Sequence, residues 1–205
     1  MSEIHIGRLL RANTRGCVAG CQINQPFPAF GSLVSIPLYE ADKAFGLVTD
    51  IHIDDDGLVR QLAASDSLPE EIIEDNRLNR NAPVELSVLF IGCSTNGTAS
   101  HLLPARPPLS LDRIFTCSDD LIRAFTSFGR FGYLRHILGA QDLPTADLLA
   151  AHLMQAGRAQ ADSGNSEWVM KAIQEIITLL RDDHGVLTAV LGAIADAFPG
   201  FSVQN

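Results

Sequence analysis

An acidic cluster around one histidine is the part of this sequence best suited to bind a metal ion; it consists of Asp50, His52, Asp54, Asp55 and Asp56. Because alternate residues of a strand project from one face, the candidate ligands are Asp50, His52 and Asp54. Hard cations prefer carboxylate oxygens, but they need about six of them around a cavity. An aspartate-rich strand end before Gly57 is also a common solvated turn, and we favour that interpretation.

Four cysteines are spread along the chain: Cys17, Cys21, Cys93 and Cys117. Cys17 and Cys21, together with His5, could suggest zinc, but no C-x-x-C pair or second ligand pair follows. A spacing of four places both thiols on one face of a strand. We therefore expect two core cysteines, and free thiols throughout, because the set is too small and dispersed for a disulfide scaffold.

One segment comes close to a phosphate-binding loop. The sequence GCSTNGTA, from Gly92 to Ala99, has Thr98 and Ala99 where that motif requires Lys and Ser or Thr. Without the lysine no side-chain charge can hold the β- and γ-phosphates, and Asn96-Gly97 instead indicates a hairpin turn. Hydrolase signatures such as G-x-S-x-G and H-E-x-x-H do not occur. We expect no cofactor and no enzymatic activity.

A run of aromatic residues offers a candidate protein-binding segment. It carries Phe125, Phe128, Phe131, Tyr133, Arg130 and Arg135, with two glycines between the rings. Apolar, glycine-containing segments of this kind can dock a partner, although core packing is the commoner fate of such residues. The arginines could form a small basic patch together with Arg123, but scattered charges more often mark a solvated helix face.

The overall charge limits the choice of partners. The 205 residues carry a net charge of −9, with only 15 basic side chains. Phosphate contacts need clustered Lys and Arg, so direct nucleic-acid binding is not expected. The sequence has no apolar run of about 20 residues and its start does not resemble a signal peptide, which predicts a cytoplasmic chain without a membrane span.

The patterns predict an α+β chain with a strand-rich region first. Alternating apolar residues and glycine or proline breaks predict five to six short strands between Ile4 and Phe115, enough for a small closed β-barrel. Ile4 to Ile23 fits two strands or one long kinked strand, and the Asn96-Gly97 hairpin could close the barrel. One short helix is expected over Ser67 to Asn76, with Ser67 as its cap and Pro69 in the first turn.

The pattern changes to a helical period after residue 117. Ser118 caps one expected helix, Pro144 begins a second, and Ser166 and Glu167 begin a third. Two apolar stripes, one over Val169 to Leu180 and one over Val186 to Ile194, are expected to pack together as a helical hairpin. These patterns divide the chain into a barrel domain at 1–116 and a helical domain at 117–205.

The strand-rich region resembles the HAS barrel, the N-terminal β-barrel of HerA-type translocating ATPases and of ATP synthase catalytic subunits. The likeness is carried by IGRLLRANTRGCVAGCQI, FGSLVSIPL, AFGLVTDIHI, VELSVLFIGC and LLPARPPLSLDRIFTCSDDLIRAF, and it covers roughly the first 125 residues. The last piece resembles the way in which the HerA barrel leads into its ATPase domain. This chain departs from the family there, because about 80 residues of helix stand where the ATPase domain would follow.

The resemblance implies an assembly role rather than catalysis. HAS barrels make contacts between subunits in their hexameric relatives, so the chain is expected to self-associate or to dock onto a separate partner such as a ring ATPase. Two alternatives remain open: a metal-dependent enzyme that uses the Asp50 to Asp56 cluster, and a nucleic-acid-associated accessory protein that relies on a partner for its basic surface.

Overall fold

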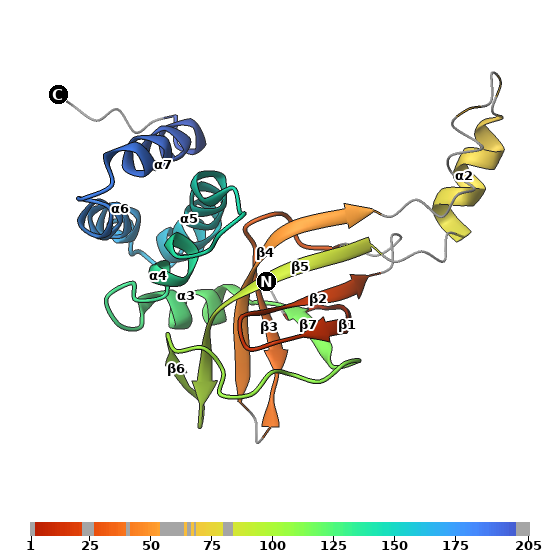
Figure 1. Ribbon diagram of the computed structural model, residues 1–205, viewed down its shortest axis with the longest axis horizontal. Coiled ribbons are helices and arrows are strands. Elements are labelled where there is room, and N and C mark those ends of the chain that lie inside the picture. Colours follow the sequence, from red (N-terminus) through yellow and green to blue (C-terminus); the bar gives the residue numbers. More distant parts are fainter. Residues whose placement is uncertain are drawn as a thin grey trace.

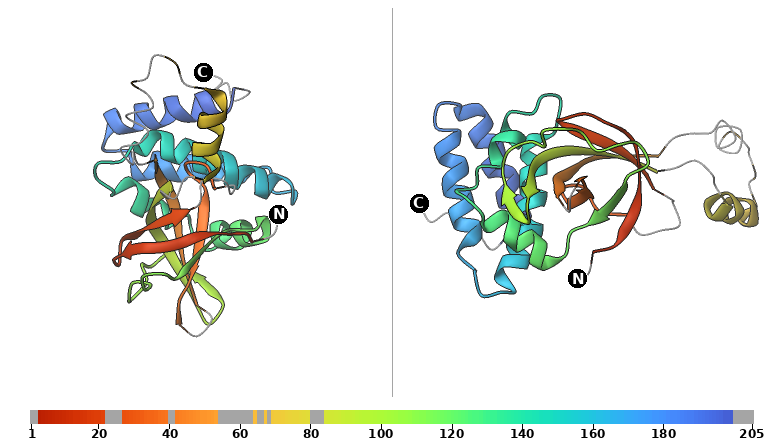
Figure 2. Two further views of the ribbon diagram at one scale, coloured as in Figure 1. Left: turned by 90° about the vertical axis from the view of Figure 1, so that its right-hand side faces the viewer. Right: turned by 90° about the horizontal axis from the view of Figure 1, so that it is seen from below.

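The computed structural model describes residues 3–21, 27–39, 42–53, 64, 67, 69–79 and 84–199. It has the expected α+β architecture, with a β-barrel followed by a layer of helices on one side (Figures 1 and 2). The strands are β1 (His5–Ala12), β2 (Gly16–Cys21), β3 (Leu33–Pro37), β4 (Lys43–Ile53), β5 (Val84–Thr95), β6 (Thr98–Ser100) and β7 (Arg113–Thr116). Within the described residues, no helix combines the length and apolar character needed to cross a bilayer.

Six antiparallel strands close the barrel. The order around the ring is β2, β1, β7, β3, β4 and β5, and β5 returns to pair with β2 from Gly16 opposite Leu89 to Cys21 opposite Val84. The Asn96-Gly97 hairpin is confirmed, since both residues have positive φ and Thr95 pairs with Thr98. It does not close the barrel, however, because β6 pairs with the far end of β5 outside the ring.

The first two strands form a hairpin, which settles the choice between two strands and one kinked strand. Asn13 shapes the turn, because its side-chain Oδ1 accepts hydrogen bonds from the backbone N–H groups of Arg15 and Gly16 at 2.7 and 3.0 Å. Gly7 permits a close approach of β1 to β2, since a Cβ there would lie 2.3 Å from the carbonyl oxygen of Gly20. The turn lies against β5, because the Phe90 N–H donates to the Arg15 carbonyl at 2.8 Å.

The inner faces of the strands fill the barrel with small and branched apolar side chains. This core contains Ile6, Leu9, Cys17, Ala19, Cys21, Val34, Ile36, Ala44, Val48, Val84, Leu86, Val88, Phe90 and Ile114. Along the first half of β5 the even-numbered positions are buried and the odd-numbered ones are partly exposed, as a half-solvated strand requires. The barrel is therefore packed with side chains rather than open as a channel.

The helices are α2 (Glu70–Asn79), α3 (Asp119–Ser127), α4 (Leu134–Leu138), α5 (Thr145–Ala161), α6 (Trp168–Leu179) and α7 (His184–Ala197). Ser118 caps α3 as expected, with its hydroxyl accepting from the Leu121 N–H. Helix α2 is also confirmed, but it begins at Glu70 with the carbonyl of Pro69 accepting from Ile72 and Ile73. In Figure 1 and in the right-hand view of Figure 2 it stands apart from the barrel and from the other helices.

Helix α5 organises the helical layer. Both α6 and α7 pack against α5. The apolar stripes that begin at Val169 and Val186 were expected to pack on each other, but each of them packs mainly on α5 instead. Helix α3 packs on α5 as well, and α4 lies against β5. The helical segment thus packs on the barrel of its own chain.

A second hydrophobic core joins the helices to the barrel. Its barrel members, Leu33, Phe45, Leu47 and Ile91, face the helices from the outer wall of β3, β4 and β5. Gly31 lets the chain approach α5 closely: it has φ +79°, and a Cβ on it would lie 2.6 Å from the Cβ of Ala151. Beside it, the Leu33 N–H donates to Gln155 Oε1 at 2.9 Å. The central strands are therefore buried on both faces.

Replacing Gly31 with alanine tests this close approach. Gly97 provides the matched control, because its φ is +76° and a Cβ there would meet nothing within 4 Å. We expect Gly97→Ala to lower the free energy of unfolding by about 1 kcal/mol through backbone strain. Gly31→Ala should cost about 1 to 3 kcal/mol more, because α5 must also shift. Urea unfolding measures both, and equal losses would contradict tight docking of α5 at Gly31.

Candidate functional site

The acidic cluster lies only partly within the described residues. Asp50 and His52 are exposed on the outer face of β4, where they lie opposite Ser87 and Glu85 of β5. Asp54, Asp55, Asp56 and Gly57 fall outside the described residues. Among the residues that are described, no group of three or more His, Cys, Asp or Glu side chains is placed to hold a metal ion.

The cysteines lie in the core. Cys17 and Cys21 point into the barrel on either side of Ala19, so the prediction that they share one buried face is confirmed. Cys93 and Cys117 are also buried, and all four thiols are free. Burial raises the pKa of the Cys17 thiol to about 12 and that of Cys21 to about 11. Neither thiol is available as a nucleophile near neutral pH.

The aromatic run is mostly internal. Phe125 and Tyr133 are completely buried between the barrel and α5, and the ring centroids of Phe125 and Phe45 lie 4.7 Å apart with the rings tilted by 37°. They therefore cannot contact a partner directly. Phe131 packs against Trp168 with ring centroids 5.5 Å apart, and Phe128 is the most exposed of the four rings.

The two arginines of this run have different environments. Arg135 donates to the backbone carbonyls of Gly132 and His101, so its main role is to hold two loops together. Arg130 is exposed in the turn between α3 and α4. Phe128, Arg130 and Arg135 are consequently the exposed members of the predicted docking segment, and Phe131 is half-buried.

Two buried histidines hold this region together, and the sequence analysis had not singled them out. The His152 ring Nε2 lies 3.1 Å from the Tyr133 hydroxyl, and burial lowers the pKa of His152 to about 4, so the ring is neutral at pH 7. His101 Nε2 lies 3.2 Å from the Phe125 carbonyl, and desolvation also lowers its pKa. The sequence did contain a signal for His152: it lies beside Leu148, Leu149 and Leu153 on the apolar stripe of α5, where a buried histidine is expected.

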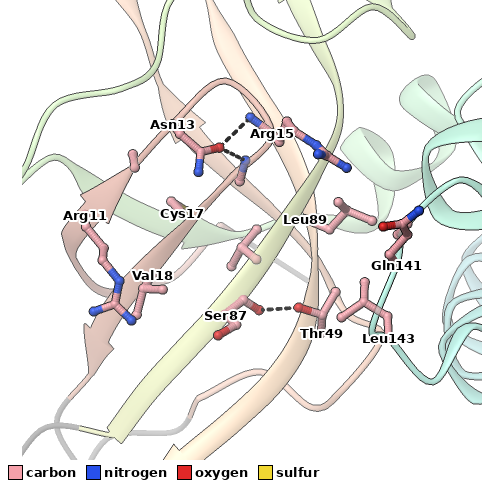
Figure 3. Close-up of a pocket in the computed structure, with 14 residues that line it drawn as sticks. Arg11, Asn13, Arg15, Cys17, Val18, Thr49, Ser87, Leu89, Gln141 and Leu143 are labelled. Carbon is pink, nitrogen blue, oxygen red and sulfur yellow. Dashed lines mark hydrogen bonds between the residues drawn. The ribbon is translucent and has the colours of Figure 1, made fainter.

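A polar groove lies between the β1–β2 turn and the loop from α4 to α5 (Figure 3). We call it the hairpin groove; its volume is about 350 Å³ and its lining is Arg11, Ala12, Asn13, Arg15, Gly16, Cys17, Val18, Thr49, Ser87, Val88, Leu89, Ala140, Gln141 and Leu143. Figure 3 shows Arg15 extending past Leu89 toward Gln141, while Arg11 lies at the opposite end beside Val18. The Thr49 hydroxyl donates to the Ser87 carbonyl in its wall.

The lining of the hairpin groove suits binding better than catalysis. It supplies two guanidinium groups, side-chain amides and hydroxyls over apolar residues, and no Asp, Glu or His is among its lining residues. General acid–base chemistry near neutral pH needs a group that titrates there, and the Cys17 thiol in the lining does not. The groove can instead accept an anionic group with an apolar neighbour.

A larger groove lies at the end of the barrel formed by the β3–β4 turn and the loop between β6 and β7. We call it the proline groove; its volume is about 860 Å³ and its lining is Pro37, Leu38, Tyr39, Asp42, Cys93, Ser94, Thr95, Pro104, Ala105, Arg106, Pro107, Pro108, Leu109 and Asp112. Its carboxylates stabilise the loops, since Asp42 accepts from the Asn96 N–H and Asp112 from the Leu109 N–H.

The segments around the proline groove carry the most exposed large apolar side chains of the described residues. Tyr39 is 81% exposed, and Leu102, Leu109 and Leu111 are 66%, 61% and 66% exposed. Leu111 is unusual because its φ is +70°, a conformation that a leucine rarely adopts. Hydrogen bonds to β1 hold it there, with its N–H donating to Leu9 and its carbonyl accepting from Arg8.

Comparison with known proteins gives no family for the chain. No protein-family model matches it, and no curated protein matches it at a significant level. What is shown is therefore the architecture: a six-stranded closed antiparallel barrel followed by helices.

Thiol reactivity tests the placement of the cysteines. At pH 8 the native thiols should remain protonated, because burial raises the pKa of Cys17, Cys21, Cys93 and Cys117. The pKa values of about 11 to 12 at Cys17, Cys21 and Cys117 lower the thiolate fraction about a hundredfold or more, so these three thiols should react with a disulfide reagent at least about 100-fold more slowly in the native protein than in urea. Cys93 should also react more slowly, because burial raises its pKa as well. One thiol that reacts at the unfolded rate would show that its site is open.

Proposed function

We propose that this chain is a non-catalytic protein-binding module that takes part in assembly, and that its barrel is of the HAS type found at the start of HerA-type ATPases. One observation carries the proposal: the highly exposed Tyr39 and Leu109 line a groove at one end of the barrel, and the loop that lines it also carries the exposed Leu102 and Leu111. Apolar surface gathered in this way is unfavourable in water and is typical of a site that a partner covers.

The construction of this surface favours binding. Four prolines line the groove, and a proline has a fixed φ, so the loop loses little conformational freedom when a partner docks. The hydrogen bonds that Asp42 and Asp112 accept from the backbone N–H groups of Asn96 and Leu109 further fix the loops before any partner arrives. A rigid apolar surface of this kind reduces the entropic cost of association.

We propose a ring ATPase of the HerA type as the partner. Support comes from the resemblance of the barrel strands, because HAS barrels contact neighbouring subunits in the hexameric members of that family. The near-match to a phosphate loop at Gly92 to Ala99 has no lysine, and we propose that the chain acts as an accessory subunit on a ring of ATPase subunits. No specific observation among the described residues favours either alternative function, the metal-dependent enzyme or the nucleic-acid-associated accessory protein.

Leu111→Gly allows a clean test of this surface. The substitution removes an exposed apolar side chain at a position whose positive φ suits glycine, so stability should be unchanged or slightly raised. We expect the triple variant Tyr39→Ser, Leu109→Ser, Leu111→Gly to fold like the wild type and to lose capture of a HerA-type ATPase from native cells by at least about tenfold. Quantitative mass spectrometry of affinity-purified samples measures the loss.

The matched control changes exposed apolar residues elsewhere. Met154 and Met170 are 51% and 42% exposed on α5 and α6, and Met154→Ser with Met170→Ser should leave capture unchanged. If the triple variant captured the ATPase as well as the wild type does, the proline groove would not be the binding surface. Failure of the wild type to capture any such ATPase would overturn the proposed partner.

A further inference from the structure

We infer that the hairpin groove binds the acidic helix α2 of a second copy of this chain, so that copies associate head to tail. This inference rests on the proposed assembly function and names one of its partners. It is carried by two features that complement each other: a groove whose only charged lining residues are arginines, and an acidic helix that stands away from the rest of the chain.

The charge of the groove is unusual for this protein. The chain has a net charge of −9, yet the lining contains Arg11 and Arg15 and no carboxylate. Arg15 makes no ion pair among the described residues. Arg11 has a long contact, 3.7 Å to Glu85, and its side chain is 69% exposed, so this pair contributes little. Both guanidinium groups are therefore available to an incoming carboxylate, which they can bind through two parallel hydrogen bonds.

Helix α2 presents matching chemistry. Glu70, Glu71 and Glu74 are exposed on it, and Ile72 is 44% exposed among them. Glu70 and Glu74 are four residues apart and lie on one side of the helix, with Glu71 next to them. A helix of ten residues is marginal in water without tertiary packing, and α2 makes no extensive packing contact with another described element. Docking would supply the missing contacts.

The floor of the groove can accommodate the side chains of such a helix. Val18, beside Arg11, and Leu89 and Leu143, on the side of Gln141, provide an apolar surface for Ile72. The amide of Gln141 lies near Arg15 and adds a donor for a carboxylate at that end. A volume of about 350 Å³ accepts a few side chains from one helix face rather than the whole helix.

The symmetry of this contact has a consequence for the assembly. The groove and α2 are different surfaces, so each copy uses one of each. Such a heterologous contact produces a closed ring where the rotation between copies allows closure, and an open chain of copies otherwise. Association should also weaken as salt increases, because it depends on exposed charges.

Charge reversal followed by charge exchange tests the inference. We expect sedimentation of the full-length chain to show association that salt weakens. Reversing the groove, with Arg11→Glu and Arg15→Glu, should weaken association at least about tenfold, and so should reversing the helix, with Glu70→Lys, Glu71→Lys and Glu74→Lys. A chain carrying all five substitutions restores opposite charges and should associate again. Circular dichroism checks that each variant folds.

A matched control reverses two other exposed cations, through Lys171→Glu and Arg181→Glu, and should associate like the wild type. A wild type that stays monomeric at all salt concentrations would overturn the inference. The inference would also be overturned if neither charge reversal weakened association, or if the chain with all five substitutions failed to associate again. None of these results bears on the proline groove, because capture of an ATPase is measured with substitutions at that other surface.

Discussion

The packing of α5 against the outer wall of the barrel is the contact on which the rest of the structure depends. Gly31 lets the two backbones approach, and Gln155 accepts a hydrogen bond from the Leu33 N–H at the start of β3. A buried backbone donor without a partner is costly, so this side chain fixes where the helix can sit. Because α6 and α7 both pack on α5, the position of the whole helical layer follows from this contact.

The same interface determines which surfaces stay open. Helices cover the outer wall of β3, β4 and the second half of β5, and this buries Phe125, Tyr133 and His152 as one aromatic group. The β1–β2 hairpin lies beside the edge of that cover, so the hairpin groove forms between the barrel and the α4–α5 loop. The proline groove lies at an end of the barrel that the helices do not cover.

Local patterns in the sequence predicted the strands, helices and turns, whereas contacts between distant residues could not be predicted from those patterns. The Asn96-Gly97 turn, the Ser118 cap and the buried face shared by Cys17 and Cys21 depend on neighbouring residues, and all three are confirmed. Barrel closure joins β2 to β5, about 70 residues apart, and nothing in the local pattern specifies that pairing. The aromatic run illustrates the same difficulty, since its spacing is compatible with a docking segment as well as with core packing, the commoner fate of such residues. Both grooves arise from such distant contacts.

The pairing at the end of β4 and the start of β5 also bears on how this protein could diversify. Ile53 lies directly opposite Val84, so the chain leaves the barrel and returns to it at neighbouring positions of one ladder. An insertion between such positions places no demand on the register of the strands, whatever its length. Evolution can therefore lengthen, shorten or exchange the segment between these two positions while the barrel beneath remains the same.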